Sequence, residues 1–155
     1  ESFLTLVNDV QNQGEFLPAA MTSEATLRKQ FAENGFISDT SERYVITDRS
    51  DNILGSVWAF RSVPYFDAIE VGYQIFDPQN HGKGYATEGL KKLIELAFSQ
   101  DHIHRAAAIC DTENIASARV MEKAGMSREG ILRKYVVQPN ISPIPRDVYS
   151  YAIVK

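Results

Sequence analysis

The stretch QNHGKGYATEGLKKL, residues 79–93, places two glycines and a lysine directly before a segment with helical periodicity. The first N–H groups of a helix have no partner inside it, and the helix dipole adds partial positive charge, so this end can bind an anion. Gly82 and Gly84 would let the main chain of residues 81–87 approach a phosphate closely, with the Lys83 side chain in reach. A plain tight turn with positive φ at both glycines explains the same residues equally well.

The composition is that of one globular domain spanning residues 1–155. Hydrophobic residues make up 44% and charged residues 23%, and no apolar run approaches the roughly 20 residues that a membrane span needs, so we expect no membrane segment. The net charge is −4 without a basic stripe, which predicts no nucleic-acid partner and suits a small cationic substrate. Cys110 is the only cysteine, which excludes an internal disulfide and fits a reducing cytoplasm. The histidine spacing predicts no metal site.

The hydrophobic period alternates between helical and extended along the chain. Helices are predicted around residues 3–10, 23–34, 85–98 and 114–125, with Ser23 and Asn114 as N-caps and Gly35 and Gly125 as stops. Strands are predicted at residues 43–48, 53–63, 68–76, 104–110, 128–137 and 146–154, with a loop at 138–145. This order predicts one α/β domain whose mostly antiparallel sheet is crossed by a central β-α-β unit.

Residues 79–84 resemble the Gln/Arg-x-x-Gly-x-Gly/Ala loop of the GNAT superfamily of acyl-CoA-dependent N-acyltransferases. The segment NIASARVMEKAGM, residues 114–126, is similar to a second element of that family, and the likeness covers about residues 68–133. It is strongest to the branch with ribosomal-protein N-terminal alanine acetyltransferases and many small-amine acetyltransferases. The resemblance implies a GNAT-like fold: a mixed, mostly antiparallel sheet flanked by helices, with a β-bulge that splays the strand ending at Phe76 from its parallel neighbour. Family members usually open with an edge strand, and none is found before Phe3.

The resemblance further implies that acetyl-CoA is the co-substrate and lies in the V-shaped cleft between the splayed strands. The loop would hold the pyrophosphate, and the strand backbone at Ile75 and Phe76 would pair with the pantetheine arm and donate an N–H to the thioester carbonyl. The implied coenzyme-binding residues are Ile75, Phe76, Gln79, His81, Gly82, Lys83, Gly84, Tyr85, Ala86, Thr87, Asn114 and Ser117.

Three residues are candidates for the chemistry. Glu70 could take the amine proton through a water, or could be a structural carboxylate. Asn114 lies beside the pantetheine in the family and is also a helix N-cap, whereas Ser117 lies near the sulfur or simply bonds back to the cap. Many relatives protonate the sulfur with a Tyr seven residues after the Asn, but Met121 stands there, so Ser117 becomes the substitute.

The predicted reaction is acetyl transfer to a primary amine by direct attack in a ternary complex. The acceptor is a protein N-terminus or a small amine, selected by the first two helices and by loops 61–67 and 138–146; Trp58, Phe60, Tyr65 and Phe66 either line the amine pocket or simply pack. The alternative function is a noncatalytic acyl-CoA-binding or interaction module. A monomer or a homodimer is expected, the latter through a bare sheet edge.

Overall fold

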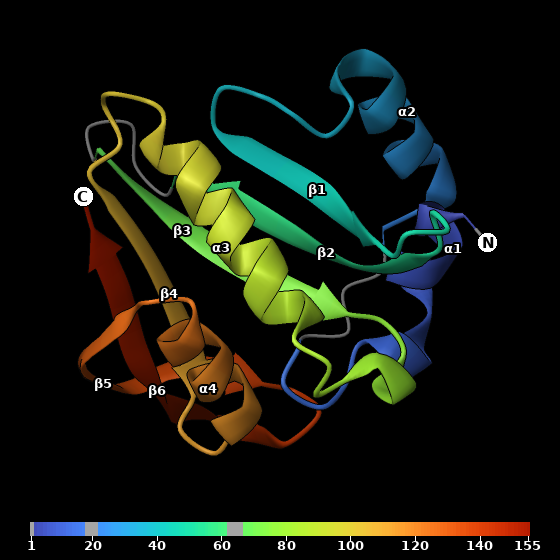
Figure 1. Ribbon diagram of the computed structural model, residues 1–155. Helices are drawn as coiled ribbons and strands as arrows, with labels where there is room; N and C mark the ends of the chain where they lie inside the picture. Colours follow the sequence, from blue (N-terminus) through green and yellow to red (C-terminus); the bar gives the residue numbers. More distant parts are fainter. Residues whose placement is uncertain (1, 18–21, 62–66) are drawn as a thin grey trace.

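The computed structural model describes residues 2–17, 22–61 and 67–155 and contains one six-stranded sheet with its helices (Figure 1). The elements are α1 (Phe3–Asn8), η1 (Val10–Asn12), α2 (Glu24–Asn34), β1 (Ser41–Thr47), β2 (Ile53–Phe60), β3 (Ala68–Ile75), η2 (Pro78–Asn80), α3 (Tyr85–Phe98), β4 (Arg105–Asp111), α4 (Ile115–Lys123), β5 (Ser127–Gln138) and β6 (Ser142–Val154). The predicted order of helices and strands is confirmed, with two 3₁₀ turns, η1 and η2, added.

The strand order in the sheet is β1-β2-β3-β4-β6-β5. Only β3 and β4 run parallel, and α3 connects them, which is the predicted β-α-β unit. Residues 2–17 contain α1 and η1 but no strand, and β1 forms one edge of the described sheet. Within the described ranges, no helix is both long and apolar enough to cross a membrane.

Local capping sets the helix boundaries as the sequence predicts. The Ser23 side chain accepts a hydrogen bond from the N–H of Thr26, and Gly35 ends α2 with a φ of 62°. The Asn114 side chain caps α4, which Gly125 follows with a φ of 94°. Each of these two helices therefore begins after a residue whose side chain accepts a hydrogen bond, and it ends at or just before a glycine in the left-handed conformation.

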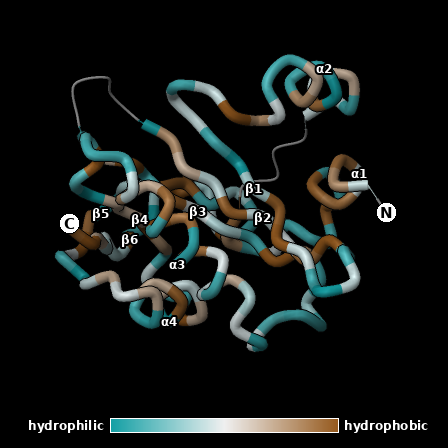
Figure 2. Tube along the Cα trace, turned by 45° about the horizontal axis from the view of Figure 1, so that its top comes forward, coloured by the Kyte–Doolittle hydropathy of each residue, from teal (hydrophilic) through white to brown (hydrophobic). Residues whose placement is uncertain are grey.

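The hydrophobic core lies between the sheet and the two helices α3 and α4, which cross the same face of the sheet in Figure 1. The buried face of α3 consists of Leu90, Leu93, Ile94 and Ala97. It packs against buried side chains of β2 and β3, and hydrophobic residues (brown) are prominent along these strands in Figure 2. This packing fixes the position of the first turn of α3 at the end of β3.

The segment from residue 138 to 145 differs from the predicted loop, because β6 already begins at Ser142 and pairs there with Gln138. Pro143 and Pro145 therefore lie inside a strand. The pairing of β6 with β4 ends at Val148, so these prolines fall where β6 has β5 as its neighbour on one side only. A proline lacks an N–H to donate, and a strand with one neighbour tolerates that loss.

Gly72 provides the space for the largest side chain of the sheet. It lies opposite Trp58, and a Cβ at Gly72 would come within 2.5 Å of the indole ring. The guanidinium carbon of Arg43 lies 4.7 Å from the ring centroid, so the indole is held between β1 and β3. Trp58 thus has a packing role, Phe60 is partly exposed, and Tyr65 and Phe66 lie outside the described residues.

We expect Gly72→Ala to lower the free energy of unfolding by about 1–3 kcal/mol, because the added methyl must displace the Trp58 ring. Gly130→Ala is the matched control, since a Cβ on this strand glycine meets no atom within 4 Å. It should change stability by less than about 0.5 kcal/mol. Urea denaturation measures both values, and equal stabilities of the two variants would contradict the packing role of Gly72.

Candidate active site

The cleft begins where β3 and β4 stop pairing. The two strands pair at three positions only, Ala68 with Arg105, Ile69 with Ala106 and Glu70 with Ala107. Beyond these pairs β3 continues to Ile75 and β4 to Asp111 without pairing to each other, which leaves two facing strand edges.

The expected bulge is not found where β3 pairs with β2. Residues 55–60 of β2 pair with residues 70–75 of β3 in a single register. The register shifts of the sheet lie instead at Ile46/Thr47 and between β5 and β6. β3 therefore diverges from β4 without any break in its pairing with β2.

Hydrogen-bond parity decides which main-chain groups of β3 face the opening. The N–H of Phe76 donates to the carbonyl of Leu54 at 2.9 Å, and the Phe76 side chain is only 1% exposed. Successive residues of a strand direct their N–H and C=O groups to alternate edges, so those of Tyr73 and Ile75 point toward β4. This corrects the expectation for Phe76, because its N–H is already used; the N–H groups of Tyr73 and Ile75 are those that face the cleft.

The glycine loop presents a run of free N–H groups at the wide end of the cleft. Gly82 and Gly84 have φ values of 74° and 89°, and neither has an atom within 4 Å of an added Cβ. The main-chain N–H groups of residues 82–87 donate no hydrogen bond to another described residue, and the first helical bond of α3 is from Glu88 to Gly84. Both glycines thus supply the positive φ of a turn, and six donors and the N-terminus of a 14-residue helix fit a phosphate or pyrophosphate.

Side chains attach this loop to the strand that precedes it. A ring nitrogen of His81 lies 3.2 Å from the carbonyl oxygen of Ile75, and Lys83 Nζ donates to the Asn80 side chain at 3.0 Å. Gln79 is exposed in η2. The first residues of α3 are half-buried; they are Tyr85, Ala86 and Thr87. The loop and the β3 edge therefore form one continuous surface.

The opposite wall of the cleft carries Asn114 and Ser117. The Asn114 Oδ1 accepts the Ser117 N–H at 3.1 Å, so its N-cap role is confirmed. The Ser117 hydroxyl does not bond back to the cap; its Oγ lies 2.7 Å from the hydroxyl of Tyr73, which also reaches the Ser117 carbonyl at 2.9 Å. Burial raises the pKa of Tyr73 well above its usual range.

Cys110 lies on β4 next to this pair of hydroxyls. Burial, followed by the charge of Asp111, raises the pKa of the thiol to about 11, although a hydrogen bond with Ser117 opposes this shift. A thiol that stays protonated at neutral pH is a poor nucleophile. Cys110 is therefore a small buried side chain, as the sequence predicts.

Glu70 occupies the last position of β3 that is paired with β4, and it is half-buried. Side chains alternate between the two faces of a strand, so Glu70 and Tyr73 lie on opposite faces of the sheet. Because Tyr73 contacts Ser117, the carboxylate and the serine approach the cleft from opposite sides.

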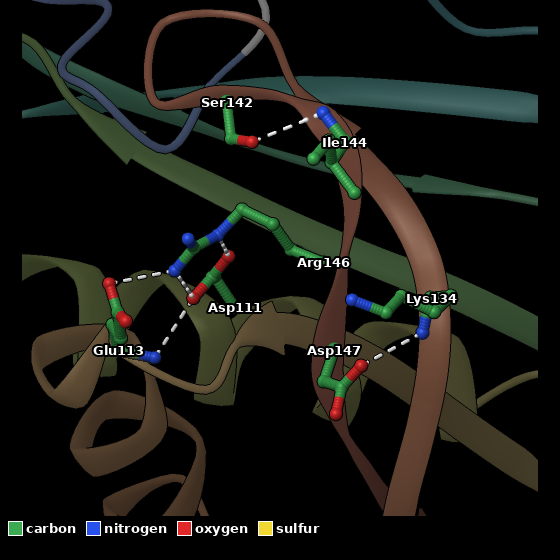
Figure 3. A network of polar contacts seen from close by, with 7 residues as sticks. All are labelled: Asp111, Glu113, Lys134, Ser142, Ile144, Arg146 and Asp147. Carbon is green, nitrogen blue, oxygen red and sulfur yellow. Dashed lines mark hydrogen bonds and ion pairs between the residues drawn. The ribbon is translucent and has the colours of Figure 1, made fainter.

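An ion-pair network around the buried Asp111 holds the end of β4 (Figure 3). Arg146 Nε lies 2.5 Å from Asp111 Oδ2, a second nitrogen lies 3.0 Å from Asp111 Oδ1, and that nitrogen also lies 2.7 Å from Glu113. Asp111 is 1% exposed and accepts the N–H of Glu113 at 2.9 Å. The guanidinium lowers the pKa of Asp111, and the two carboxylates raise the pKa of Arg146. The network fixes the turn that leads to Asn114.

Sequence reasoning missed Tyr73, Asp111 and Arg146 as residues of this region. The strand pattern contained a signal for Tyr73, since it shares a sheet face with Ile69 and Val71, but nothing in the sequence indicated its contact with α4. Within the described residues, no group of three metal-ligating side chains is found.

The comparisons with known proteins agree with this geometry. The acetyltransferase (GNAT) domain family matches residues 1–127. The N-acetyltransferase YnaD of Bacillus subtilis (strain 168) is 31% identical over 149 residues, covering 86% of this chain and 84% of the relative. The N-acetyltransferase YjcK of the same organism is 33% identical over 113 residues, covering 70% of this chain and 62% of the relative.

Two solved structures have the same fold. A GNAT acetyltransferase from Bacillus anthracis superposes with a TM-score of 0.75 and 27% identity, covering 97% of this chain and 86% of that one. Spermidine N-acetyltransferase from Vibrio cholerae, solved with CoA and spermine, gives a TM-score of 0.78 at 20% identity with the same coverage. With the family match over most of its length, the chain belongs to the GNAT family and is an N-acetyltransferase.

Proposed function

We propose that this N-acetyltransferase uses acetyl-CoA to acetylate a primary amine by direct attack in a ternary complex. The observation that carries the proposal is the run of six main-chain N–H groups, residues 82–87, at the wide end of the β3–β4 cleft. A pyrophosphate offers acceptor oxygens and negative charge to this run and to the positive end of the α3 dipole. The narrow end of the cleft, at Glu70, then receives the thioester.

The residues of the chain have separate tasks in this reaction. Acetyl-CoA supplies an acetyl group on a thioester. Of the N–H groups that face the cleft, that of Tyr73 lies nearest Glu70 and donates to the carbonyl oxygen as that oxygen gains charge, while the Ile75 backbone pairs with the pantetheine arm. Glu70 removes the amine proton through a water, and Ser117 donates a hydrogen bond toward the sulfur from the other face. Positioning both substrates in one cleft lowers the barrier further, and no covalent enzyme intermediate is needed.

Two classes of acceptor suit the chain. The likeness of residues 68–133 to the ribosomal-protein branch favours the amino group of a protein N-terminus. A polyamine is the second candidate, because the net charge of −4 attracts a polycation and the solved spermidine N-acetyltransferase of the same fold binds spermine. Both acceptors present a primary amine to the same base.

We expect intact protein to bind acetyl-CoA and Gly84→Glu to weaken that binding by about 100-fold or more. A carboxylate about 4 Å from the pyrophosphate repels it by about 4 kcal/mol at an effective dielectric constant of about 20. Gly35→Glu is the matched control, because Gly35 also has a positive φ and open space at its Cβ but lies at the end of α2. Isothermal titration calorimetry measures all three affinities. Failure of the intact protein to bind would refute the donor site.

We expect Glu70→Gln to lower kcat by about 100-fold or more with little change in acetyl-CoA affinity, because the amide cannot accept the amine proton. Glu42→Gln, on the edge strand β1, is the control for removing one acidic charge. Steady-state rates are measured with an alanine-initiated peptide and with spermidine, and the preferred acceptor is the one with the higher kcat/KM. An unchanged kcat would leave Glu70 a structural role.

A further inference from the structure

The hydroxyls of Tyr73 and Ser117 connect the two walls of the cleft. Tyr73 lies three residues beyond the last β3 residue that pairs with β4, and Ser117 lies in the first turn of α4. Their oxygens are 2.7 Å apart, and the Tyr73 oxygen is also 2.9 Å from the Ser117 carbonyl oxygen. One phenol thus contacts both polar oxygens of a single serine.

Counting hydrogens gives this contact two arrangements. Tyr73 has one hydrogen, and the Ser117 carbonyl can only accept. If Tyr73 donates to that carbonyl, the Ser117 hydroxyl is free to donate to the Tyr73 oxygen or to the Cys110 sulfur, and its hydrogen is then not available to a ligand. If Tyr73 instead donates to Ser117 Oγ, the serine hydrogen becomes available for an acceptor in the cleft.

We propose that Tyr73 is a positioning residue that switches between these two arrangements, so that the Ser117 hydroxyl donates to the coenzyme sulfur as negative charge develops there. This role rests on the proposed function. No proton leaves Tyr73: as the carbon–sulfur bond breaks, the electron pair goes to the sulfur, and the hydrogen bond from Ser117 stabilises it. A charged acceptor strengthens a hydrogen bond, which favours the second arrangement.

The surroundings of Tyr73 suit this role. Burial keeps the phenol protonated, so it is always a donor. The titratable groups around it are Cys110 on β4 and Tyr151 on β6, whose pKa values are raised to about 11 and about 12. Neither therefore competes as an anion at neutral pH. Met121, at the position where many relatives have a Tyr, is fully buried in the core.

A double-mutant cycle tests the coupling. We expect Tyr73→Phe to lower kcat by about 10-fold, the lower end of the value of a hydrogen bond to a charged group, with KM for acetyl-CoA unchanged. In a Ser117→Ala background the same change should have no further effect on kcat, because Tyr73 acts through the serine. Tyr151→Phe is the matched control, since its hydroxyl donates to Glu122 at 2.9 Å instead. It should leave kcat unchanged.

A binding measurement tests the pair without any acceptor. CoA itself should bind the intact protein more tightly as pH rises through the thiol pKa, about 8.5 for a free thiol, because the Ser117 hydroxyl stabilises the thiolate. We expect this pH dependence to be lost in Ser117→Ala, reduced in Tyr73→Phe and kept in Tyr151→Phe. CoA binding with the same pH dependence in all four proteins overturns the roles of Ser117 and Tyr73 at the sulfur and leaves the coenzyme site itself in place. Absence of CoA binding in all four overturns the proposed function, and this role with it.

Discussion

Main-chain pairing between β3 and β4 ends after three residue pairs, and the rest of the site depends on that early end. Unpaired strand edges inside a sheet leave donors and acceptors without partners, which is normally unfavourable. Beyond the last β3–β4 pair, each strand stays paired on its outer side, β3 with β2 over residues 70–75 in one register and β4 with β6 over residues 105–111. The outer pairings hold the two strands in place while their inner edges diverge. An extended ligand with amide groups can then pair with those edges as another strand would.

The end of β4 is held in position by a buried charge. Removing a carboxylate from water is costly unless it is paired and hydrogen-bonded, and Asp111 has both a guanidinium and a main-chain N–H as partners. The guanidinium comes from Arg146 on β6, the strand that pairs with β4 on its outer side. Because Asp111 also fixes the turn before Asn114, the ion pair sets where α4 begins. The serine of the cleft is thus positioned through β6 as well as through α4.

The features that sequence could predict are those set by neighbouring residues. Ser23, Asn114 and Gly125 follow capping rules that act within one helical turn, and the glycine loop was recognisable because positive φ favours glycine. The order of elements followed from hydrophobic periodicity in the same way.

The features that sequence could not predict depend on which strand edge has a neighbour. Pro143 and Pro145 indicate a loop locally, yet the strand accommodates them because β6 is paired on one side only there. The role of Phe76 changed because hydrogen-bond parity depends on the register of β2, which periodicity does not define. Tyr73 and Ser117 are 44 residues apart and meet only because β3, α3, β4 and α4 fold as a unit.

The phenol that contacts the Ser117 hydroxyl comes from the opposite wall of the cleft, and this makes the contact sensitive to the width of the cleft. A tyrosine supplied by α4, which the family resemblance implies at position 121, would lie on the same wall as the serine and would be insensitive to the separation of the strands. In this chain the corresponding residue is the buried Met121, and the phenol comes from β3 on the other wall. The distance between the Tyr73 and Ser117 oxygens therefore depends on how far β3 and α4 lie apart. A ligand that fits between the strands keeps the hydroxyls in contact, whereas one that forces the strands apart separates them. Under the role proposed for Tyr73, the rate of the chemistry would therefore depend on how the coenzyme fits between β3 and β4.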